Sequence, residues 1–400
     1  MSNNMNRTPE PHKRSPSKHV IVPLRQETTA PLTPPTTITK TQERNVKQEW
    51  IEPKKLLPEL KKTSSAKRKP PLRYRPPKNS VFDARGYLDG VHAKTTDTKN
   101  AGFLKYALQN SRRIIIISGA GISVAAGIPD FRSGNGLFST LRQDGVSSGK
   151  ELFDINHVYS NDEMSLKFNR MIVDLFERSR DNQPTQFHRM MNWFAEEGRL
   201  RRLYTQNIDC LENKLTHLKT TIPLKSPFPT TIQLHGSINH MSCMKCSKIY
   251  QLDPVVFKCH EEQKNTQIVP LCAQCEEFDA VRAVAGMRSQ GIGKLKPRIV
   301  LYNEIHPEGE SIADIISKDL KGRPDCLIIV GTSLKIPGVR TMSKKFARQI
   351  HNSKGIVLWF NRELPSHSIR DFVEFIDLIV VGDCQDIPLI LESEKIFEGI

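Results

Sequence analysis

The sequence predicts an α/β fold with a doubly wound parallel sheet that binds its ligands at the carboxyl ends of the strands. Four short segments are apolar and largely β-branched, as is typical of strands buried on both faces of a sheet. Three of them run directly into a glycine. Amphipathic helices, such as the one expected over 187–197, lie between the strands. The four predicted strands span 112–118, 326–330, 356–360 and 378–381.

The beginning of the chain differs in composition from the rest. Residues 1–80 contain 18 Lys and Arg against 6 Asp and Glu, and 13 of the 26 prolines. Such a segment offers too little apolar surface to offset the entropy lost on ordering. We therefore expect a disordered, basic, proline-rich tail over 1–95 and a folded domain over 96–400 that begins with a helix near Thr98. Because most of the net charge lies in the tail, nucleic acid contact is expected only there.

A compact basic cluster in the tail consists of Lys61, Lys62 and the run from Lys67 to Lys69. It is typical of a nuclear-import signal, and we expect a nuclear protein; a solvated charge run is the alternative. No segment approaches the roughly 18 apolar residues of a membrane span, and a secretory signal is not expected. Inside a cell, the eight cysteines are then expected to be thiols or metal ligands.

The first predicted strand ends in Gly119-Ala120-Gly121, which indicates a phosphate-binding turn. Glycine lets the backbone approach a pyrophosphate, and the N-terminus of the next helix supplies N–H donors. Alone this signal is weak, and a plain tight turn is the alternative. The dehydrogenase fingerprint has another glycine three residues after Gly121, where this chain has Val124. Hydride transfer is therefore disfavoured.

Three further motifs place polar residues near this turn. A lone histidine is often structural, but the one here lies between a polar cluster and a metal motif, which favours catalysis. The three motifs contain Asp130, Phe131 and Arg132, then Gln206, Asn207 and Asp209 after a strand-like segment, and then His235 at a strand end before Gly236.

Two Cys-x-x-Cys knuckles predict a closed tetrahedral zinc site in a module over about 240–290. Four thiolates leave zinc no open position, so its role would be structural. The spacer of 25 residues is longer than usual and indicates an enlarged loop; Cys259 and His260 inside it are the alternative ligands. The knuckles are formed by Cys243, Cys246, Cys272 and Cys275.

The motifs GAGISVAAGIPDFRS, TQNID, LHG, paired CxxC, GTSL, NRE and GDC occur in this order over about 98–400. In this series the chain resembles the sirtuin family of NAD-dependent protein deacylases. Its long zinc loop and basic tail resemble a fungal nuclear branch that acts on a lysine of the histone core. The resemblance implies a large Rossmann-like domain and a smaller lobe of a zinc module and a helical module, with NAD and acyl-lysine meeting between them.

The resemblance also implies roles for residues that match the family's motifs. His235 matches the catalytic base, and Asn207 and Asp209 would position ribose and water. The first cofactor segment would be Gly119, Ala120, Gly121, Asp130, Phe131 and Arg132; Gln206, Asn207 and Asp209 would surround nicotinamide and its ribose; Gly331, Thr332, Ser333, Asn361, Glu363 and Cys384 would contact the adenosine half.

The acyl-lysine strand departs from the family pattern. The family's Phe-Gly-Glu corresponds here to Tyr302, Asn303 and Glu304, so asparagine replaces glycine. The substrate backbone would pair with this strand, including Val300, by β-augmentation, which depends on main-chain groups. Asparagine tolerates unusual backbone angles, so we expect the strand to persist.

The resemblance implies that the chain uses NAD to deacetylate protein lysines, with acetylated histone as the expected substrate. The acyl oxygen would attack the ribose carbon as nicotinamide leaves, and His235 would then accept a ribose hydroxyl proton. The products would be free lysine, nicotinamide and O-acetyl-ADP-ribose. Two alternatives are a dehydrogenase, which would form NADH, and a silent NAD-binding scaffold or chromatin adaptor, which would lack a reacting residue.

Overall fold

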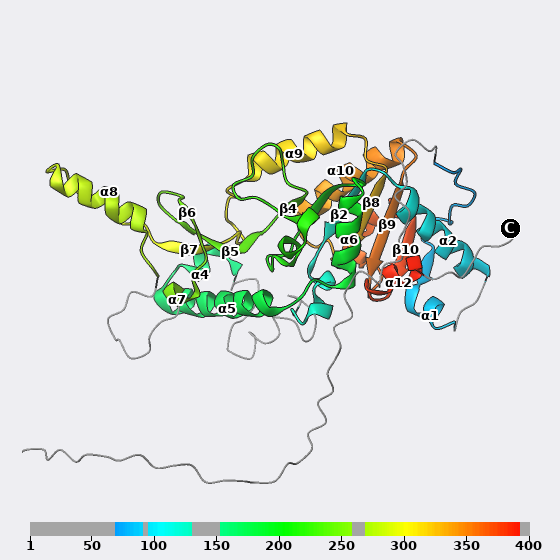
Figure 1. The fold of residues 1–400 in the computed structure, drawn as a ribbon, viewed down its shortest axis with the longest axis horizontal. Helices are drawn as coiled ribbons and strands as arrows, with labels where there is room; N and C mark the ends of the chain where they lie inside the picture. Colours follow the sequence, from blue (N-terminus) through cyan, green and yellow to red (C-terminus); the bar gives the residue numbers. More distant parts are fainter. Residues whose placement is uncertain (1–68, 91–94, 130–152, 258–268, 393–400) are drawn as a thin grey trace, which may run out of the picture. The chain divides into compact units, whose positions relative to one another are not determined.

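The computed structural model describes residues 69–90, 95–129, 153–257 and 269–392. Seven parallel strands form its main sheet in the order β1-β10-β9-β8-β2-β3-β4 (Figure 1). The four predicted strands are β2, β8, β9 and β10. The strands are β1 (Val81–Asp83), β2 (Ile114–Ser118), β3 (Leu200–Thr205), β4 (Thr231–Gln233), β8 (Cys326–Val330), β9 (Ile356–Asn361) and β10 (Leu378–Val381).

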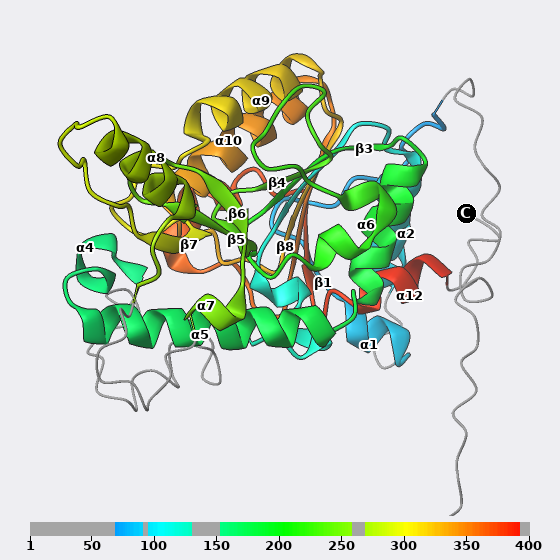
Figure 2. The same ribbon diagram turned by 60° about the vertical axis from the view of Figure 1, so that its left-hand side comes forward.

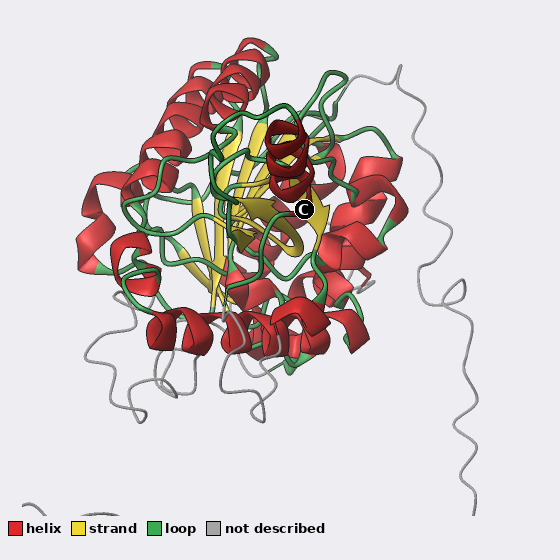
Figure 3. Ribbon diagram, turned by 90° about the vertical axis from the view of Figure 1, so that its left-hand side faces the viewer, coloured by secondary structure: helices red, strands yellow, loops and turns green. Residues whose placement is uncertain are grey.

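Helices cover both faces of the main sheet, as predicted for a doubly wound fold (Figure 3). The central strand β2 shows why: Ile114 and Ile116 belong to one apolar core, whereas Ile115 and Ile117 belong to the other. The first core contains side chains of α2 (Thr95–Asn110), α6 (Gln186–Glu196) and α12 (Asp386–Glu392), and the second contains side chains of α9 (Gly309–Lys321), α10 (Pro337–Asn352) and α11 (Arg370–Val373).

A smaller lobe is built around a three-stranded antiparallel sheet in the order β6-β5-β7. The long helix α5 lies against β5 and against α7 (Figure 2), and Phe168 and Ile172 of α5 are buried in the core of this lobe. The elements of the lobe are α4 (Ile155–Val158), α5 (Asp162–Asp181), β5 (Gly236–Cys243), β6 (Ile249–Gln251), α7 (Pro254–Phe257), α8 (Ala273–Val284) and β7 (Leu295–Ile299).

The predicted boundary of the tail at residue 95 is wrong. Residues 69–90 pack onto the folded domain as a strap that includes β1 and α1 (Ala84–Leu88). Strand β1 pairs in parallel with β10, and Phe82 and Ala84 have no exposed surface. A three-residue strand is too short to show a recognisable alternation of apolar and polar residues. The prediction therefore depended on the proline-rich, basic composition of the segment, which is typical of disorder. Residues 1–68 lie outside the described part of the chain.

No helix in the described part of the chain has both the length and the apolar character needed to cross a membrane.

The strap leads to a testable distinction between two truncations. Deleting residues 1–68 should leave thermal unfolding nearly unchanged. Deleting residues 1–90 should lower the unfolding temperature strongly, because it removes β1 and the buried ring of Phe82 and exposes the edge of β10. Loss of one buried phenylalanine alone costs about 3–5 kcal/mol. The point variant Phe82→Ala in the full chain separates the loss of this packing from the loss of strand β1. Equal unfolding temperatures of the two truncations would show that residues 69–90 do not stabilise the folded domain.

Candidate active site and metal centre

Two glycine turns meet at the carboxyl ends of β2 and β8. The N–H of Gly119 donates to the carbonyl of Val330, and the N–H of Gly121 donates to that of Gly331, both at 3.0 Å. A Cβ on Gly121 would lie 2.7 Å from the Cα of Gly331, so no side chain fits there. Residues Ala120–Ile122 form a short 3-10 turn. The bare backbone at the end of adjacent parallel strands fits the pyrophosphate of a dinucleotide.

Gln206 and Asn207 follow β3 and reach across to these turns. The Gln206 side-chain amide donates to the carbonyl of Ser118 at 3.2 Å and to the hydroxyl of Thr332 at 2.8 Å. The Asn207 amide donates to the Ser123 hydroxyl at 3.1 Å. Its carbonyl oxygen Oδ1 is buried without a hydrogen-bond partner in the described residues. A buried acceptor without a partner fits a ligand that brings its own donor, such as a ribose hydroxyl or an amide.

Two buried carboxyl groups follow Asn207 in the chain. Asp209 is 6% exposed and accepts from the N–H of Leu211 at 3.1 Å, and Glu212 is 1% exposed. Burial raises the pKa of Asp209. Burial, and after it the charge of Asp209, raises the pKa of Glu212 to about 8. Glu212 was missed in the sequence; the only signal is its position one 3-10 turn after Asp209, within Leu211–Lys214.

Glu212 should make the stability of the protein depend on pH. Its folded pKa lies above its ordinary value of 4.5, so the native chain keeps a proton that the unfolded chain releases. The stabilisation is complete below pH 4.5, declines above it and is lost as pH rises through about 8. Denaturant unfolding of Glu212→Gln should therefore show a smaller loss between about pH 5 and pH 8 than wild type. Glu196→Gln, at an exposed position, is the matched control; identical losses in wild type and Glu212→Gln would refute the assignment.

His235 follows β4 and is held by its ring and by its main chain. Its Nδ1 lies 2.9 Å from the carbonyl oxygen of Gln206. A carbonyl only accepts, so Nδ1 carries the hydrogen and Nε2 is the nitrogen of the neutral ring that can take up a proton. The His235 carbonyl accepts from the N–H of Val300 at 3.0 Å. Next to it, Gly236 has a φ of +84°, and a Cβ there would lie 2.2 Å from the carbonyl oxygen of Arg298.

The predicted acyl-lysine strand lies beside His235, but much of its main chain is already bonded. The N–H of Tyr302 donates to Phe153 at 2.7 Å, and its carbonyl accepts from Ile155 at 3.1 Å. The Glu304 carboxylate accepts from the N–H of Leu301 and pairs with a lysine of β7. Within the described residues, the carbonyl of Val300 and both main-chain groups of Asn303 make no hydrogen bond. These groups are therefore the ones that a peptide backbone can reach.

Asn303 occupies the left-handed region, with a φ of +62°. This agrees with the expectation that asparagine can adopt the unusual backbone angles of the glycine that it replaces. Its side-chain amide donates to the Asp154 carboxylate. Asp154 also caps α4 by accepting from the N–H of Asn156 at 3.0 Å. The asparagine side chain, which glycine lacks, therefore links the end of the predicted acyl-lysine strand to the start of α4 through Asp154.

The residues expected around adenosine line the same edge of the sheet. The Asn361 amide donates to the carbonyl of Thr332 at 3.3 Å, and the Cys384 thiol lies 3.9 Å from the carbonyl oxygen of Gly121. Gln385, which the sequence did not single out, accepts from the N–H of Phe187 at 2.9 Å. Gly331 and Ser333 are half-buried in the turn after β8, and Glu363 is exposed after β9. Asp130, Phe131 and Arg132 lie outside the described residues.

The four predicted zinc ligands come together in the smaller lobe. All four sulfur atoms lie within 4.8 Å of one another, and two pairs, Cys243 with Cys275 and Cys246 with Cys272, are 3.8 and 3.7 Å apart. A tetrahedron with zinc–sulfur bonds of about 2.3 Å has sulfur atoms about 3.8 Å apart. The four thiols therefore fit one structural zinc ion. The alternative ligands Cys259 and His260 lie outside the described residues.

The surroundings of the cluster are those of a metal knuckle. The N–H groups of Lys245 and Cys246 donate to the sulfur of Cys243 at 3.3 and 3.4 Å, and the Tyr250 hydroxyl lies 3.2 Å from the sulfur of Cys272. A Cβ on Gly293 would lie 2.3 Å from the sulfur of Cys243. Hydrogen bonds to thiolate sulfur orient the ligands and offset their charge.

This fold and site define a protein of the Sir2 family. The family matches residues 119–338, more than half of the chain, and the chain belongs to it. It is 52% identical over 374 residues to the NAD-dependent histone deacetylase HST4 of Saccharomyces cerevisiae, which covers 92% of this chain and 100% of that protein. It is 36% identical to the histone deacetylase HST3 of the same yeast, over 72% of this chain and 66% of that protein.

Solved structures share the fold at low sequence identity. A Sir2 protein in complex with deacetylated p53 peptide and 3′-O-acetyl ADP-ribose aligns with a TM-score of 0.53 and 23% identity, over 74% of this chain and 97% of that one. A Sir2 homologue in complex with NAD aligns with a TM-score of 0.51 and 19% identity, over 73% of this chain and 92% of that one. The predicted Rossmann-like architecture with a smaller zinc-bearing lobe is confirmed.

Proposed function

We propose that this chain is an NAD-dependent protein-lysine deacetylase that acts on histones in the nucleus. The observation that carries the proposal is the 52% identity to a histone deacetylase along 92% of the chain. The site supports it independently, since the glycine turns, the buried acceptor of Asn207 and the oriented ring of His235 lie at one edge of the sheet.

His235 would act as the general base. The glycine turns would hold NAD, which would supply the electrophilic ribose carbon that loses nicotinamide and receives the acetyl oxygen. The Nδ1–H bond to the carbonyl of Gln206 holds the ring so that Nε2 can accept a proton from a ribose hydroxyl. A base positioned in this way contributes typically about 10²–10⁴-fold to a rate.

Asn207 and Asp209 would position the ribose and hold water away from it. Ser123 fixes the Asn207 amide, so that its Oδ1 is available to accept from the ligand. Asp209, two residues further along the chain, is 6% exposed. Burial of this kind protects a reactive cofactor from hydrolysis. The zinc cluster has four sulfur ligands and no open position, so its part is to hold β5, β6 and β7 together.

The peptide substrate would use the main-chain groups of Val300 and Asn303. Because the Tyr302 main chain and the Glu304 carboxylate are bonded within the fold, we propose these two residues as supports of the strand. Of the substrate contacts expected over 300–304, we therefore retain those to the main-chain groups of Val300 and Asn303. The acetylated lysine would approach His235 from a position next to Val300, because the N–H of Val300 donates directly to the carbonyl of His235.

Asn303→Gly should preserve deacetylation of short acetyl-peptides and shift the order of KM values among peptides. The change keeps the left-handed φ of +62° and removes only the bond to Asp154. A proline would be a poor probe, because its fixed φ of about −65° is incompatible with this backbone. The matched control is Asn79→Gly, where φ is +63° on the strap. A fall in turnover of more than about ten-fold, with NAD affinity intact, would mean that the asparagine side chain itself binds substrate.

Acetylated core histones and NAD provide the direct test of the proposed function. Mass spectrometry should show loss of acetyl groups from specific lysines together with nicotinamide and O-acetyl-ADP-ribose in equal amounts. Formation of NADH instead would indicate a dehydrogenase, and binding of NAD without turnover would indicate a scaffold. Localisation of the full chain, with the cluster at 61–69 intact or replaced by alanine, tests the nuclear assignment.

A further inference from the structure

A basic depression lies at the amino-terminal ends of β2 and β8, on the edge of the sheet opposite the glycine turns. It measures about 680 Å³, and its charged side chains are Lys69, Arg112, Arg113, Arg323 and Asp325. Polar residues at the end of α10 complete the lining. Four cations therefore face one carboxylate in a surface that the deacetylase reaction does not use.

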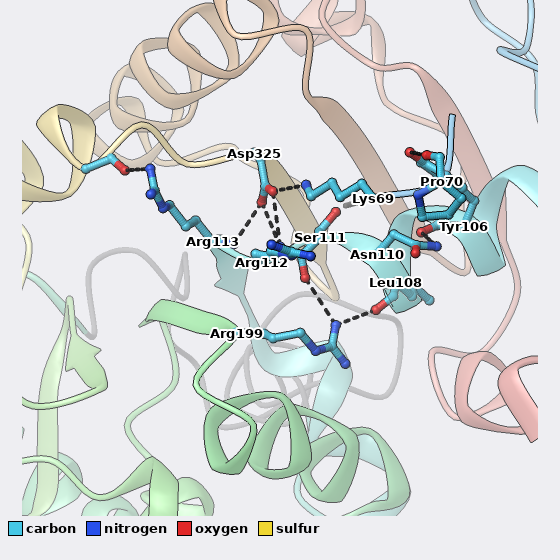
Figure 4. A network of polar contacts seen from close by, with 11 residues as sticks. Lys69, Pro70, Tyr106, Leu108, Asn110, Ser111, Arg112, Arg113, Arg199 and Asp325 are labelled. Carbon is cyan, nitrogen blue, oxygen red and sulfur yellow. Dashed lines mark hydrogen bonds and ion pairs between the residues drawn. The ribbon is translucent and has the colours of Figure 1, made fainter. Parts of the chain in front are cut away.

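The single carboxylate is occupied within the fold. Asp325 accepts from the main-chain N–H groups of Arg112 and Arg113, the closer at 2.8 Å, and pairs with the Lys69 ammonium (Figure 4). The Arg113 guanidinium donates to the carbonyl of Gly322 at 3.0 Å, which orients it without neutralising it. Among the described residues, no acidic side chain pairs with Arg323. A positive charge thus remains on this surface.

The depression is also the place where the basic tail joins the folded domain. Lys69 is the first described residue, and the strap after it is anchored by the Tyr106 hydroxyl, which donates to the carbonyl of Pro70 at 2.8 Å (Figure 4). Further along, Arg75 pairs with Asp377. In the sequence, the residues immediately before Lys69 belong to the basic cluster at 61–69. In the sequence, the cations of the tail therefore lead directly into Lys69, the first cation of the depression.

We propose that this basic depression binds the phosphate backbone of duplex DNA. Arg112, Arg113 and Arg323 are exposed and come from two separate parts of the chain, an arrangement that suits a long polyanion more than one enclosed phosphate. Guanidinium groups bind phosphate oxygens through paired N–H donors, and such contacts are independent of base sequence. This departs from the expectation that only the tail contacts nucleic acid.

The position of the depression leaves the active site accessible. A five-residue strand spans about 17 Å, and β2 separates the arginines before Ile114 from the glycine turn after Ser118. DNA and an acetylated lysine can therefore be held at the same time. The proposal does not depend on the deacetylation chemistry, because DNA binding is measured without NAD.

The test compares the full chain with the double variant Arg112→Glu/Arg323→Glu. The main-chain bonds to Asp325 survive these changes, since Arg112 uses its backbone N–H for that contact. Fluorescence anisotropy with a labelled duplex of about 30 base pairs should show about ten-fold or more weaker binding at about 100 mM salt, and a shallower dependence of affinity on salt. Short acetyl-peptide turnover and thermal unfolding should match wild type, which reports that the variant is folded.

The matched control is Lys99→Glu/Lys248→Glu, which makes the same charge change at exposed positions on α2 and on the turn between β5 and β6. It should change DNA affinity by no more than about two-fold. Equal losses in the two double variants would overturn the proposal in favour of a diffuse charge effect. The proposal would also be overturned if Arg112→Glu/Arg323→Glu bound DNA with full affinity while deletion of residues 1–68 abolished DNA binding. Displacement of the duplex by inorganic phosphate at about 1 mM would overturn it as well, because it would indicate a site for a single phosphate.

Discussion

Replacing His235 by alanine should reduce deacetylation by about 100-fold or more while leaving NAD affinity and thermal unfolding close to wild type. The ring is half-buried after β4, where its Nδ1 lies 2.9 Å from the carbonyl oxygen of Gln206, and it belongs to none of the three apolar cores, so we expect its removal to cost the fold little. Turnover is measured as deacetylated peptide by mass spectrometry, and NAD affinity by titration calorimetry.

His235→Asn separates the base from its anchor. The asparagine amide can still donate to the carbonyl of Gln206, as Nδ1 does now, but it offers no proton acceptor at the position of Nε2. We expect this variant to be as inactive as His235→Ala. Activity within about ten-fold of wild type in either variant would remove His235 from proton transfer.

Replacing Cys272 by alanine should release zinc and unfold the smaller lobe. The sulfur of Cys272 is one of the four within 4.8 Å of one another, and it also bonds to the Tyr250 hydroxyl. Zinc contributes on the order of 10 kcal/mol in isolated modules, and less where a large domain folds alongside. Zinc content by elemental analysis should fall from one ion per chain to none, together with loss of peptide turnover.

Two other cysteines serve as controls for the metal. Cys326→Ala shortens a buried side chain of β8 far along the chain from the cluster, and it should keep one zinc ion. Cys259→Ala should keep zinc as well. Loss of metal in Cys259→Ala, with retention in Cys272→Ala, would show that the fourth ligand comes from the enlarged loop between the knuckles.

The sequence allowed prediction of those features that are encoded locally. The strands β2, β8, β9 and β10 are short apolar segments whose burial on both faces is visible in their composition. Each zinc knuckle is also local, because two cysteines three residues apart already form half of a tetrahedral site. The ordered series of motifs then placed His235 and Asn207 at the same edge of the sheet.

Features that depend on distant contacts could not be predicted. Strand β1 has three residues, and its identity comes from its pairing with β10. The raised pKa of Glu212 results from complete burial beside Asp209, which no local pattern reveals. The same holds for the pairing of Tyr302 with residues 153–155, which occupies main-chain groups that the sequence suggested for substrate.

The pairing of β1 with β10 also constrains how the protein is made. Val81 lies opposite Ile379, so the strap emerges from the ribosome about 300 residues before the strand that receives it. At about 5–20 residues per second, this interval lasts roughly 15–60 s. During that time β1 has no strand to pair with, and Phe82 cannot pack against β10. Completion of the sheet is therefore one of the last steps of synthesis, and a ribosome that stalls before β10 would release a chain that cannot bury its own strap.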